Sequence, residues 1–261
     1  MDNLKQNLEV VKKYVYQAGQ AIFQMAAEGF ETAYKANEDP VTTADLKADS
    51  ILREGLTEDF PGTGWLSEET RDDYSRLDKE LVWVVDPIDG TKEFVSGIPE
   101  YAVSVALVED GLPVLAVVYN PATEELFAAA HGQGAWLNGE AINAEHALEA
   151  KPVLLASRSE IRRGGFEPFE PFAEIRPCGS IAYKLALVAA GIADATFSLG
   201  PKNEWDIAAG VLLVSESGGN VTNRSGAPFT FNQRSTLVDG IVATTKRALR
   251  PVRMLIERVT F

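Results

Sequence analysis

The clearest hydrophobic pattern of the chain lies near its N-terminus. Apolar residues from Leu4 to Met25 recur in alternating steps of three and four, which places them on one stripe of a long helix. After a polar loop at residues 35–40, a second helix is predicted to begin at a threonine cap, Thr42 or Thr43, and to run towards Phe60. Both helices need a surface to cover, so we expect them to pack on a sheet.

Short apolar runs typical of strands fill the middle of the chain. Residues 64–67 and 81–85 are two such runs, and residues 109–111 and 138–139 have the sequences of tight turns. These turns join further predicted strands into an antiparallel sheet, which comprises residues 101–108, 114–119, 126–130 and 134–137.

Helices and strands alternate in the second half of the chain, which is typical of α/β layering. The predicted elements are strands at 153–156, 193–198 and 240–244 and helices at 179–190, at 206–217 and from Lys246 onwards. Residues 162–172 are predicted to form a surface loop. A composition shift at residues 147–152 divides the chain into an N-terminal α+β lobe, residues 1–150, and a C-terminal α/β lobe, residues 151–261.

The composition fits a globular protein of one large domain or of two lobes that share a cleft, because 261 residues with 46% hydrophobic content can bury a substantial core. No apolar run has the length of a membrane span and no signal-type segment is present, so we expect a cytoplasmic protein without a membrane partner. The single cysteine, Cys178, excludes an internal disulfide, and a small residue near a turn is the simplest account of it.

The net charge of −14 at pH 7 argues against a nucleic-acid polymer as partner, because a phosphate backbone needs a basic surface. A small anionic substrate remains compatible with this charge, since bound metal ions reverse the local sign of a site. Most of the charge is expected to be solvated surface.

The strand at 81–85 ends in the sequence Asp86-Pro-Ile-Asp-Gly-Thr91. Two carboxylates, Asp86 and Asp89, fall in one turn, and Gly90 lets the backbone approach a ligand closely. The amides of Gly90 and Thr91 can then face an anion. The segment suggests metal ions that hold a phosphate, although an ordinary turn explains it better when it is taken alone.

Further acidic residues lie outside this turn, and each has a simple structural explanation. Asp45 is in the first turn of its helix, where the helix dipole favours a carboxylate. Asp206 is at a helix start, where it can act as a cap. Glu68 and Glu69 follow a predicted strand, and adjacent glutamates are usually solvated.

Taken together and in this order, the acidic elements resemble those of the inositol monophosphatase superfamily of magnesium-dependent, lithium-sensitive phosphatases: Asp45, Glu68-Glu69, Asp86 to Thr91 and Trp205-Asp206. Four separated elements in one order are far more specific than any one of them, and turn, helix-start and cap preferences do not explain their co-occurrence. The resemblance implies a layered α+β and α/β fold, an αβαβα sandwich of two lobes with the active site between them.

By this resemblance, two or three magnesium ions bind to oxygens from distant segments of the chain. Glu68, Asp86 and the carbonyl of Ile88 would bind one ion, and Asp86, Asp89 and Asp206 would bind a second.

The resemblance also implies a catalytic group. Thr91, linked to Asp45, would act with Glu68 to position a water at the metal for in-line attack, without a covalent enzyme intermediate. The amides of Gly90 and Thr91 would hold the phosphate. Glu69 would either support the ligands from behind or remain an exposed charge.

Candidate substrate-binding residues include Asp206 and Ser180. Ser180 lies at a helix start, where capping explains it equally well. Lys184 lies inside the apolar helix at 179–190, and we expect its side chain to snorkel towards solvent rather than to bind phosphate.

Different motifs favour different substrates. Residues 92–94 and 200–206 resemble the bacterial 3'(2'),5'-bisphosphate nucleotidases, and Ser198 replaces a glutamate that inositol enzymes tend to have. In the other direction, Glu160 stands where the nucleotidases often have histidine, and the helix starting at Gly179 fits the inositol enzymes better in length. We favour hydrolysis of 3'-phosphoadenosine 5'-phosphate to AMP and phosphate, a reaction of sulfate assimilation.

Two other functions stay open. One is hydrolysis of inositol 1-phosphate or a sugar phosphate, including fructose 1,6-bisphosphate. The other is a non-catalytic protein that uses the metal site to bind a phosphorylated metabolite. In each case the partner is a small phosphorylated metabolite, and the protein is expected to be a monomer or a homodimer.

Overall fold

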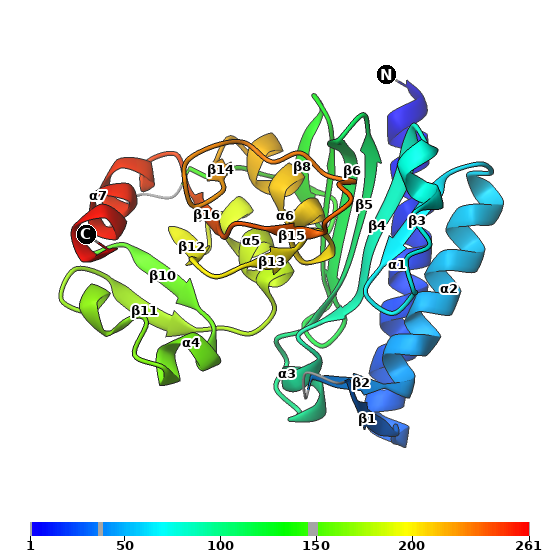
Figure 1. Ribbon diagram of the computed structural model, residues 1–261, viewed down its shortest axis with the longest axis horizontal. Coiled ribbons are helices and arrows are strands. Elements are labelled where there is room, and N and C mark those ends of the chain that lie inside the picture. Colours follow the sequence, from blue (N-terminus) through cyan, green and yellow to red (C-terminus); the bar gives the residue numbers. More distant parts are fainter. Residues whose placement is uncertain (1, 36–38, 146–150, 261) are drawn as a thin grey trace.

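The computed structural model of the protein describes residues 2–35, 39–145 and 151–260, which form five stacked layers in the order helix, sheet, helix, sheet, helix (Figure 1). This layering confirms the αβαβα sandwich predicted from the sequence. Most of the composition shift at residues 147–152 lies outside the described residues. No described helix is both long and apolar enough to cross a membrane.

Two long helices, α1 (Asp2–Glu28) and α2 (Thr43–Asp59), form the first layer. The predicted apolar stripe of α1 is buried against the sheet. Thr42 caps α2, because its hydroxyl oxygen accepts hydrogen bonds from the amides of Ala44 and Asp45, so the predicted threonine start is confirmed. A small hairpin of β1 (Thr32–Tyr34) and β2 (Pro40–Thr42) precedes this cap.

The second layer is a seven-stranded sheet in sequential order. Among the described residues, only its first pair of strands, β3 and β4, is parallel, and all the other pairs are antiparallel. Strand β4 alternates strictly, with Trp83 and Val85 facing the first two helices and Val82 and Val84 facing the molecular centre. The strands are β3 (Gly64–Ser67), β4 (Leu81–Asp89), β5 (Ala102–Glu109), β6 (Leu112–Asn120), β7 (Glu125–Ala130), β8 (Gly134–Leu137) and β9 (Glu140–Ile142).

The third layer consists of α5 (Ile181–Ala189) and α6 (Glu204–Glu216), which lie between the two sheets. Every residue of α5 is buried, including its one charged residue, Lys184. A helix covered on all sides has no solvent face, which explains why its sequence is apolar almost throughout.

A five-stranded mixed sheet forms the fourth layer, in the order β11 (Glu174–Pro177), β10 (Val153–Ala156), β12 (Ala195–Ser198), β16 (Ile241–Thr244) and β14 (Asn220–Thr222). Helix α7 (Leu249–Thr260) covers its outer face, with α4 (Arg158–Arg162) nearby (Figure 1). The remaining short elements are η1 (Ser75–Asp78), α3 (Thr91–Val95), η2 (Glu167–Phe169), β13 (Lys202–Asn203) and β15 (Leu237–Val238).

The predicted surface loop at residues 162–172 is wrong in its central part. Phe166 and Phe169 are buried, and their rings lie 4.9 and 5.0 Å from the ring of Phe197. These phenylalanines fill the space between the second sheet and α7. The proline and glycine residues around them therefore shape a packed segment rather than a solvated one.

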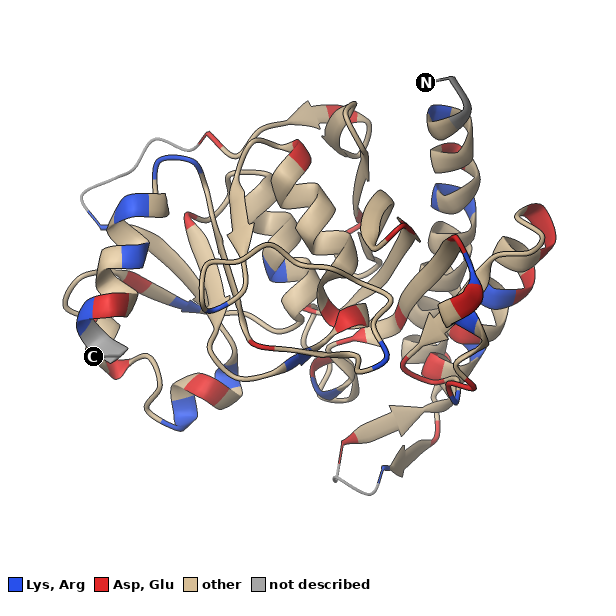
Figure 2. Ribbon diagram, turned by 45° about the horizontal axis from the view of Figure 1, so that its top comes forward, with Lys and Arg blue, Asp and Glu red and all other residues tan. Residues whose placement is uncertain are grey.

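The net charge of −14 is unevenly distributed. Figure 2 shows acidic residues gathered at the end of α2, whereas basic residues lie along α7 at the opposite side of the molecule. The acidic excess is thus largely a property of the surface, apart from the carboxylates described below.

Helix α6 packs tightly against α5 at Gly210. A β-carbon at this position would lie 2.4 Å from Leu185 Cδ1 and 2.6 Å from Leu185 Cβ. Only glycine leaves room for this approach, so the central layer depends on a residue that is otherwise unfavourable within a helix.

We expect Gly210→Ala to lower the free energy of unfolding by about 1–3 kcal/mol, because the added methyl group overpacks the helix interface. Urea denaturation of Gly210→Ala and of Gly200→Ala, where an added β-carbon meets nothing within 4 Å, would measure this difference. Helix propensity alone would instead stabilise Gly210→Ala by about 1 kcal/mol, so the sign of the change decides between the two effects.

Candidate active site

The turn after β4 brings its carboxylates to the edge of the sheet. The pairing of β4 with β5 is irregular between Asp86 and Asp89, and the amide of Ile88 donates to Asp86 Oδ1 at 3.1 Å. Gly90 then adopts a left-handed φ of +96°, and a β-carbon there would lie 2.9 Å from the carbonyl oxygen of Glu100. The glycine is therefore required for both the backbone conformation and the close approach.

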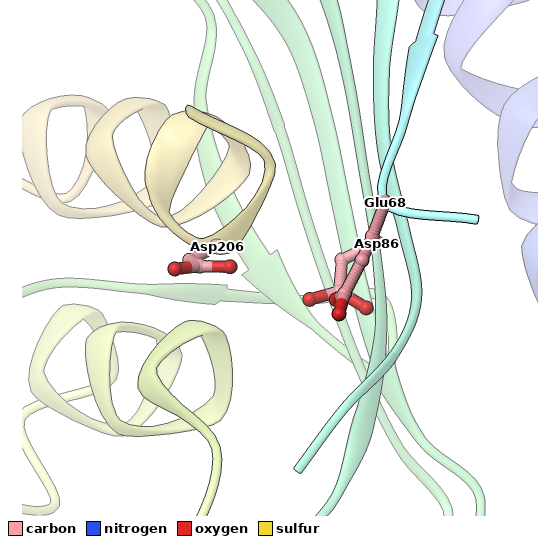
Figure 3. Close-up of side chains that lie close together, drawn as sticks. All are labelled: Glu68, Asp86 and Asp206. Atoms are coloured by element: carbon pink, nitrogen blue, oxygen red, sulfur yellow. The ribbon is translucent and has the colours of Figure 1, made fainter. Parts of the chain in front are cut away.

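Three carboxylates converge near this edge. Glu68 comes directly after β3, Asp86 lies in β4, and Asp206 is the third residue of α6. One oxygen of each lies within 4.8 Å of the others, and Figure 3 shows Asp206 on α6 across from Glu68 and Asp86. The parallel pairing of β3 with β4 places Glu68 beside Asp86, since the amide of Glu68 continues the ladder to the carbonyl of Val85 at 3.2 Å.

Burial and mutual repulsion make this cluster electrostatically unfavourable without a counter-ion. Burial, reinforced by the charge of Glu68, raises the pKa of Asp86 well above its ordinary value. Burial and the charge of Asp89 raise the pKa of Asp206 to about 8. Three hard oxygen donors that repel one another match the preference of a divalent cation such as Mg²⁺, so the residues fit the metal that the sequence suggested.

One cation of the chain itself already faces the cluster. Lys35, just after β1, places its Nζ 2.7 Å from Glu68 Oε1 and 2.8 Å from Glu69 Oε1. Burial raises the pKa of Glu69, and the hydrogen bond from Lys35 opposes that rise. Glu69 is therefore a largely buried partner of Lys35 rather than an exposed charge. Its pairing with Lys35, which lies in the loop after β1, has no local signal in the sequence.

Asp89 lines the same pocket but is oriented towards α5. Its Oδ2 accepts hydrogen bonds from Ser180 Oγ at 2.7 Å and from the amide of Ala182 at 2.6 Å. Burial raises its pKa, and these two hydrogen bonds work against that rise. Ser180 also caps α5, because its Oγ accepts from the amide of Tyr183 at 2.9 Å. The capping alternative for Ser180 is thus present in the structure, and a substrate contact remains a prediction.

Thr91 and Asp45 are in direct contact. Thr91 Oγ1 lies 3.1 Å from Asp45 Oδ1 and 3.0 Å from the carbonyl oxygen of Ile88. The other carboxylate oxygen of Asp45 accepts from the amide and hydroxyl of Thr42. Burial raises the pKa of Asp45 despite these hydrogen bonds. The cap of α2 thereby anchors the carboxylate that holds Thr91.

The prediction that Lys184 snorkels to solvent is wrong. Its exposed fraction is 3%, and burial lowers the pKa of its ammonium group, which Glu160 partly offsets. Glu160 itself accepts from Ser157 Oγ and from Ser198 Oγ, the latter at 2.7 Å. Lysine inside an otherwise apolar helix of nine residues was the available signal, because a helix covered on every side offers no path for snorkelling.

The carboxylates and these basic residues share one pocket of about 400 Å³. Its lining includes the carboxylates Glu68, Asp86, Asp89 and Asp206 together with the basic residues Lys92, Arg158, Arg162, Lys184 and Lys202. Cys178 is buried nearby, and burial raises the pKa of its thiol to about 12, which leaves no reactive thiolate at neutral pH.

The five-layer fold with an acidic cluster at its centre is that of a metal-dependent phosphatase. A family model described as the inositol monophosphatase family matches residues 3–256, and the chain belongs to this family. The family supports an enzyme that hydrolyses phosphate esters of small molecules.

Relatives of known sequence include two bacterial proteins. Nus factor SuhB of Escherichia coli (strain K12) is 34% identical over 232 residues, which cover 85% of this chain and 84% of SuhB. Inositol-1-monophosphatase of Rhizobium meliloti (strain 1021) is 35% identical over 263 residues, with 96% of each chain covered.

Solved structures agree with this assignment. The inositol monophosphatase (IMPase) of Thermotoga maritima has a TM-score of 0.85 at 29% identity and covers 100% of this chain and 98% of its own. CysQ of Bacteroides thetaiotaomicron, described as a bacterial member of the inositol monophosphatase family, has a TM-score of 0.78 at 28% identity, with 93% and 98% covered.

We expect the metal-free protein to lose stability as the pH rises from about 4 towards 8. The pKa of Asp206 is raised in the folded state from 3.8 to about 8, so the folded protein binds the proton more tightly, and this contribution disappears on deprotonation. Thermal unfolding with chelator at pH 5 and pH 8 would measure the loss. In Asp206→Asn the pH profile should be flatter, and Mg²⁺ should raise the wild-type Tm most at pH 8. Identical profiles for the two proteins would contradict this origin of the pH dependence.

Proposed function

We propose that the protein is a magnesium-dependent, lithium-sensitive phosphomonoesterase that converts 3'-phosphoadenosine 5'-phosphate to AMP and phosphate. The observation that carries the proposal is that one pocket is lined both by a cluster of carboxylates and by several basic side chains. A substrate with two phosphate groups complements this lining, since one phosphate can lie at the metal ligands and the other can pair with basic side chains.

In this proposal Glu68, Asp86 and the Ile88 carbonyl hold one magnesium ion, and Asp86, Asp89 and Asp206 hold a second. Bound magnesium supplies the positive charge that offsets the charge of the phosphate. Asp89 can bind magnesium only through an oxygen that is not already engaged. Its Oδ2 accepts from Ser180 and Ala182, so Oδ1 is the oxygen available for the metal.

The chain's own residues orient the reactants. The Thr91 hydroxyl, which lies between Asp45 and the Ile88 carbonyl, would act with Glu68 to orient the attacking water. The hydroxyl would accept the proton of the water while it passes its own proton to Asp45 Oδ1, which lies 3.1 Å away. Gly90 and Thr91 line the pocket, and in this proposal their amides hold the phosphate. Because these groups are fixed by α2 and β4, much of the orientation is present before substrate binds.

Lys184 gives the strongest support for a second phosphate. Among the described residues no hydrogen-bond acceptor is assigned to its ammonium group, although the residue is almost completely buried and lines the pocket. Arg158, in contrast, is committed to Glu100 and Glu93. A buried ammonium group facing a pocket is stabilised by an anionic ligand.

Hydrolysis of inositol 1-phosphate or of a sugar phosphate, including fructose 1,6-bisphosphate, is the second candidate. It is favoured by the 35% identity to the Rhizobium meliloti protein, whose name is inositol-1-monophosphatase. Cytoplasmic location, the monomeric or homodimeric state and the exclusion of nucleic-acid partners remain predictions from the sequence.

We expect faster phosphate release from 3'-phosphoadenosine 5'-phosphate than from inositol 1-phosphate, with activity abolished by chelator and reduced by lithium. Steady-state phosphate assays with both esters at saturating Mg²⁺ would give kcat/KM for each. Equal or higher kcat/KM for inositol 1-phosphate would reject the nucleotide assignment and retain the phosphatase. No metal-dependent release from any ester would reject the enzyme itself.

The proposed contact of Lys184 with the second phosphate is tested by Lys184→Met, which removes the charge with little change in volume. Hydrogen bonds to charged groups contribute about 1.5–3 kcal/mol, so the ratio of kcat/KM for 3'-phosphoadenosine 5'-phosphate over adenosine 3'-phosphate should fall roughly ten- to hundredfold. Lys92→Met is the matched control, because Lys92 lines the same pocket but is paired with Asp39 at 2.6 Å. An unchanged ratio in Lys184→Met would show that Lys184 does not recognise the second phosphate.

A further inference from the structure

A buried arginine joins two loops that flank the carboxylate cluster. Arg76 lies in η1, in the segment that follows Glu68, and has an exposed fraction of 1%. Its Nη1 donates to Asn232 Oδ1 at 2.6 Å, and its Nη2 donates to the carbonyl oxygen of Gln233 at 2.9 Å. Asp72 neutralises its charge, with contacts of 3.1 Å to Nε and 2.9 Å to Nη2.

The same two partner residues also contact the first turn of α6. Glu204 is fully buried, and its carboxylate accepts from the amide of Asn232 at 2.7 Å and from the amide of Gln233 at 2.8 Å. Its own amide donates to the carbonyl of Thr236 at 2.8 Å. The segment 232–236 is therefore held by Arg76 on one side and by Glu204 on the other.

This chain of contacts, Arg76 to residues 232–233 to Glu204, is here called the Arg76 relay. It bridges the two structural halves that supply the cluster. Arg76 packs against β3, since a β-carbon on Gly64 would lie 3.0 Å from Arg76 Cβ, and Glu68 follows directly after β3. Glu204 is two residues before Asp206 in the same helical turn.

We propose that Arg76 is a positioning residue that sets the separation between Glu68 and Asp206 through this relay. The proposal rests on the proposed function, in which both carboxylates bind magnesium. The two carboxylates repel each other, and the ions need them at a fixed spacing, so the spacing must be imposed by the surrounding structure. The relay reaches both segments without touching either carboxylate.

The chemistry of arginine suits this role. Its planar guanidinium group presents donors in a fixed fork, and here the fork binds Asp72, a side-chain amide oxygen and a backbone carbonyl at once. Lysine carries the same charge but cannot hold these three acceptors in one plane. Because Asp72 neutralises its charge, Arg76 is not suited to bind an anionic ligand.

The test is magnesium binding by isothermal titration calorimetry in Arg76→Lys and Arg76→Met, with thermal unfolding measured in parallel. Groups that hydrogen-bond a metal ligand directly change affinity by about ten- to hundredfold, and a group one step further away should act less strongly. We expect the Kd for Mg²⁺ to rise about three- to tenfold in both variants. Arg76→Lys keeps the buried charge and remains informative if Arg76→Met does not fold.

Arg253→Met is the matched control. Arg253 donates to Thr222 Oγ1 at 3.0 Å on the far side of the second sheet, so its loss should lower the Tm without altering the Kd for Mg²⁺. A lowered Tm with an unchanged Kd in the Arg76 variants would show that Arg76 is only structural and would overturn the proposal.

A double-mutant cycle with Glu204→Gln tests the relay itself. If Arg76 and Glu204 act through the same two residues, the Kd of the double variant for Mg²⁺ should be close to the higher of the two single-variant Kd values. If instead the fold increases in Kd of the two single variants multiply in the double variant, the two residues act independently, which contradicts the relay. Absence of Mg²⁺ binding by the wild-type protein would instead remove the proposed function, and the positioning role with it.

Discussion

The arrangement of this molecule depends on holding like charges together. Glu68, Asp86 and Asp206 carry the same charge and share a partly buried site, where burial and neighbouring carboxylates raise the pKa of Asp86 and of Asp206. Such a cluster persists only if packing and hydrogen bonds elsewhere offset its cost or a cation is bound. The five layers supply the packing, and each carboxylate is attached to an element whose position is fixed by the core.

The three carboxylates are held in place in different ways. Glu68 and Asp86 are neighbours because β3 and β4 form the only parallel pair among the described strands of the first sheet, so both strands reach the same edge. Asp206 belongs to a helix that fills the space between the sheets. Its orientation is set by the capping interaction with the amide of Asn203 at 2.9 Å. The site therefore combines one rigid local unit with one partner placed across the molecule.

Local sequence signals predicted much of the fold. The stripe of α1, the cap at Thr42 and the strands of the first sheet follow from hydrophobic spacing and turn residues, because these signals depend on neighbours in sequence. The family resemblance predicted the acidic residues that the structure gathers in one pocket. It did not show that Asp89 is oriented towards Ser180, which depends on how α5 docks.

What the sequence did not predict depends on contacts between distant segments. Phe166 and Phe169 looked like loop residues because their partner, Phe197, lies about 30 positions away. Lys184 looked like a snorkelling residue because the segments that cover α5 are distant in sequence, and only the almost wholly apolar sequence of α5 indicated that it is covered on every side. Arg76 carried no signal at all, since its partners at 232 and 233 are separated from it by more than 150 residues.

The separation of Glu68 from Asp206 along the chain, 206 − 68 = 138 residues, also bears on how the protein reaches its native state. Closing so long a segment costs conformational entropy before any contact compensates for it. A partly folded chain with only the first sheet formed would hold Glu68 beside Asp86 and lack the third oxygen donor. Metal-binding competence should thus arise late in folding, when α6 docks between the sheets, and would report completion of the fold rather than its beginning.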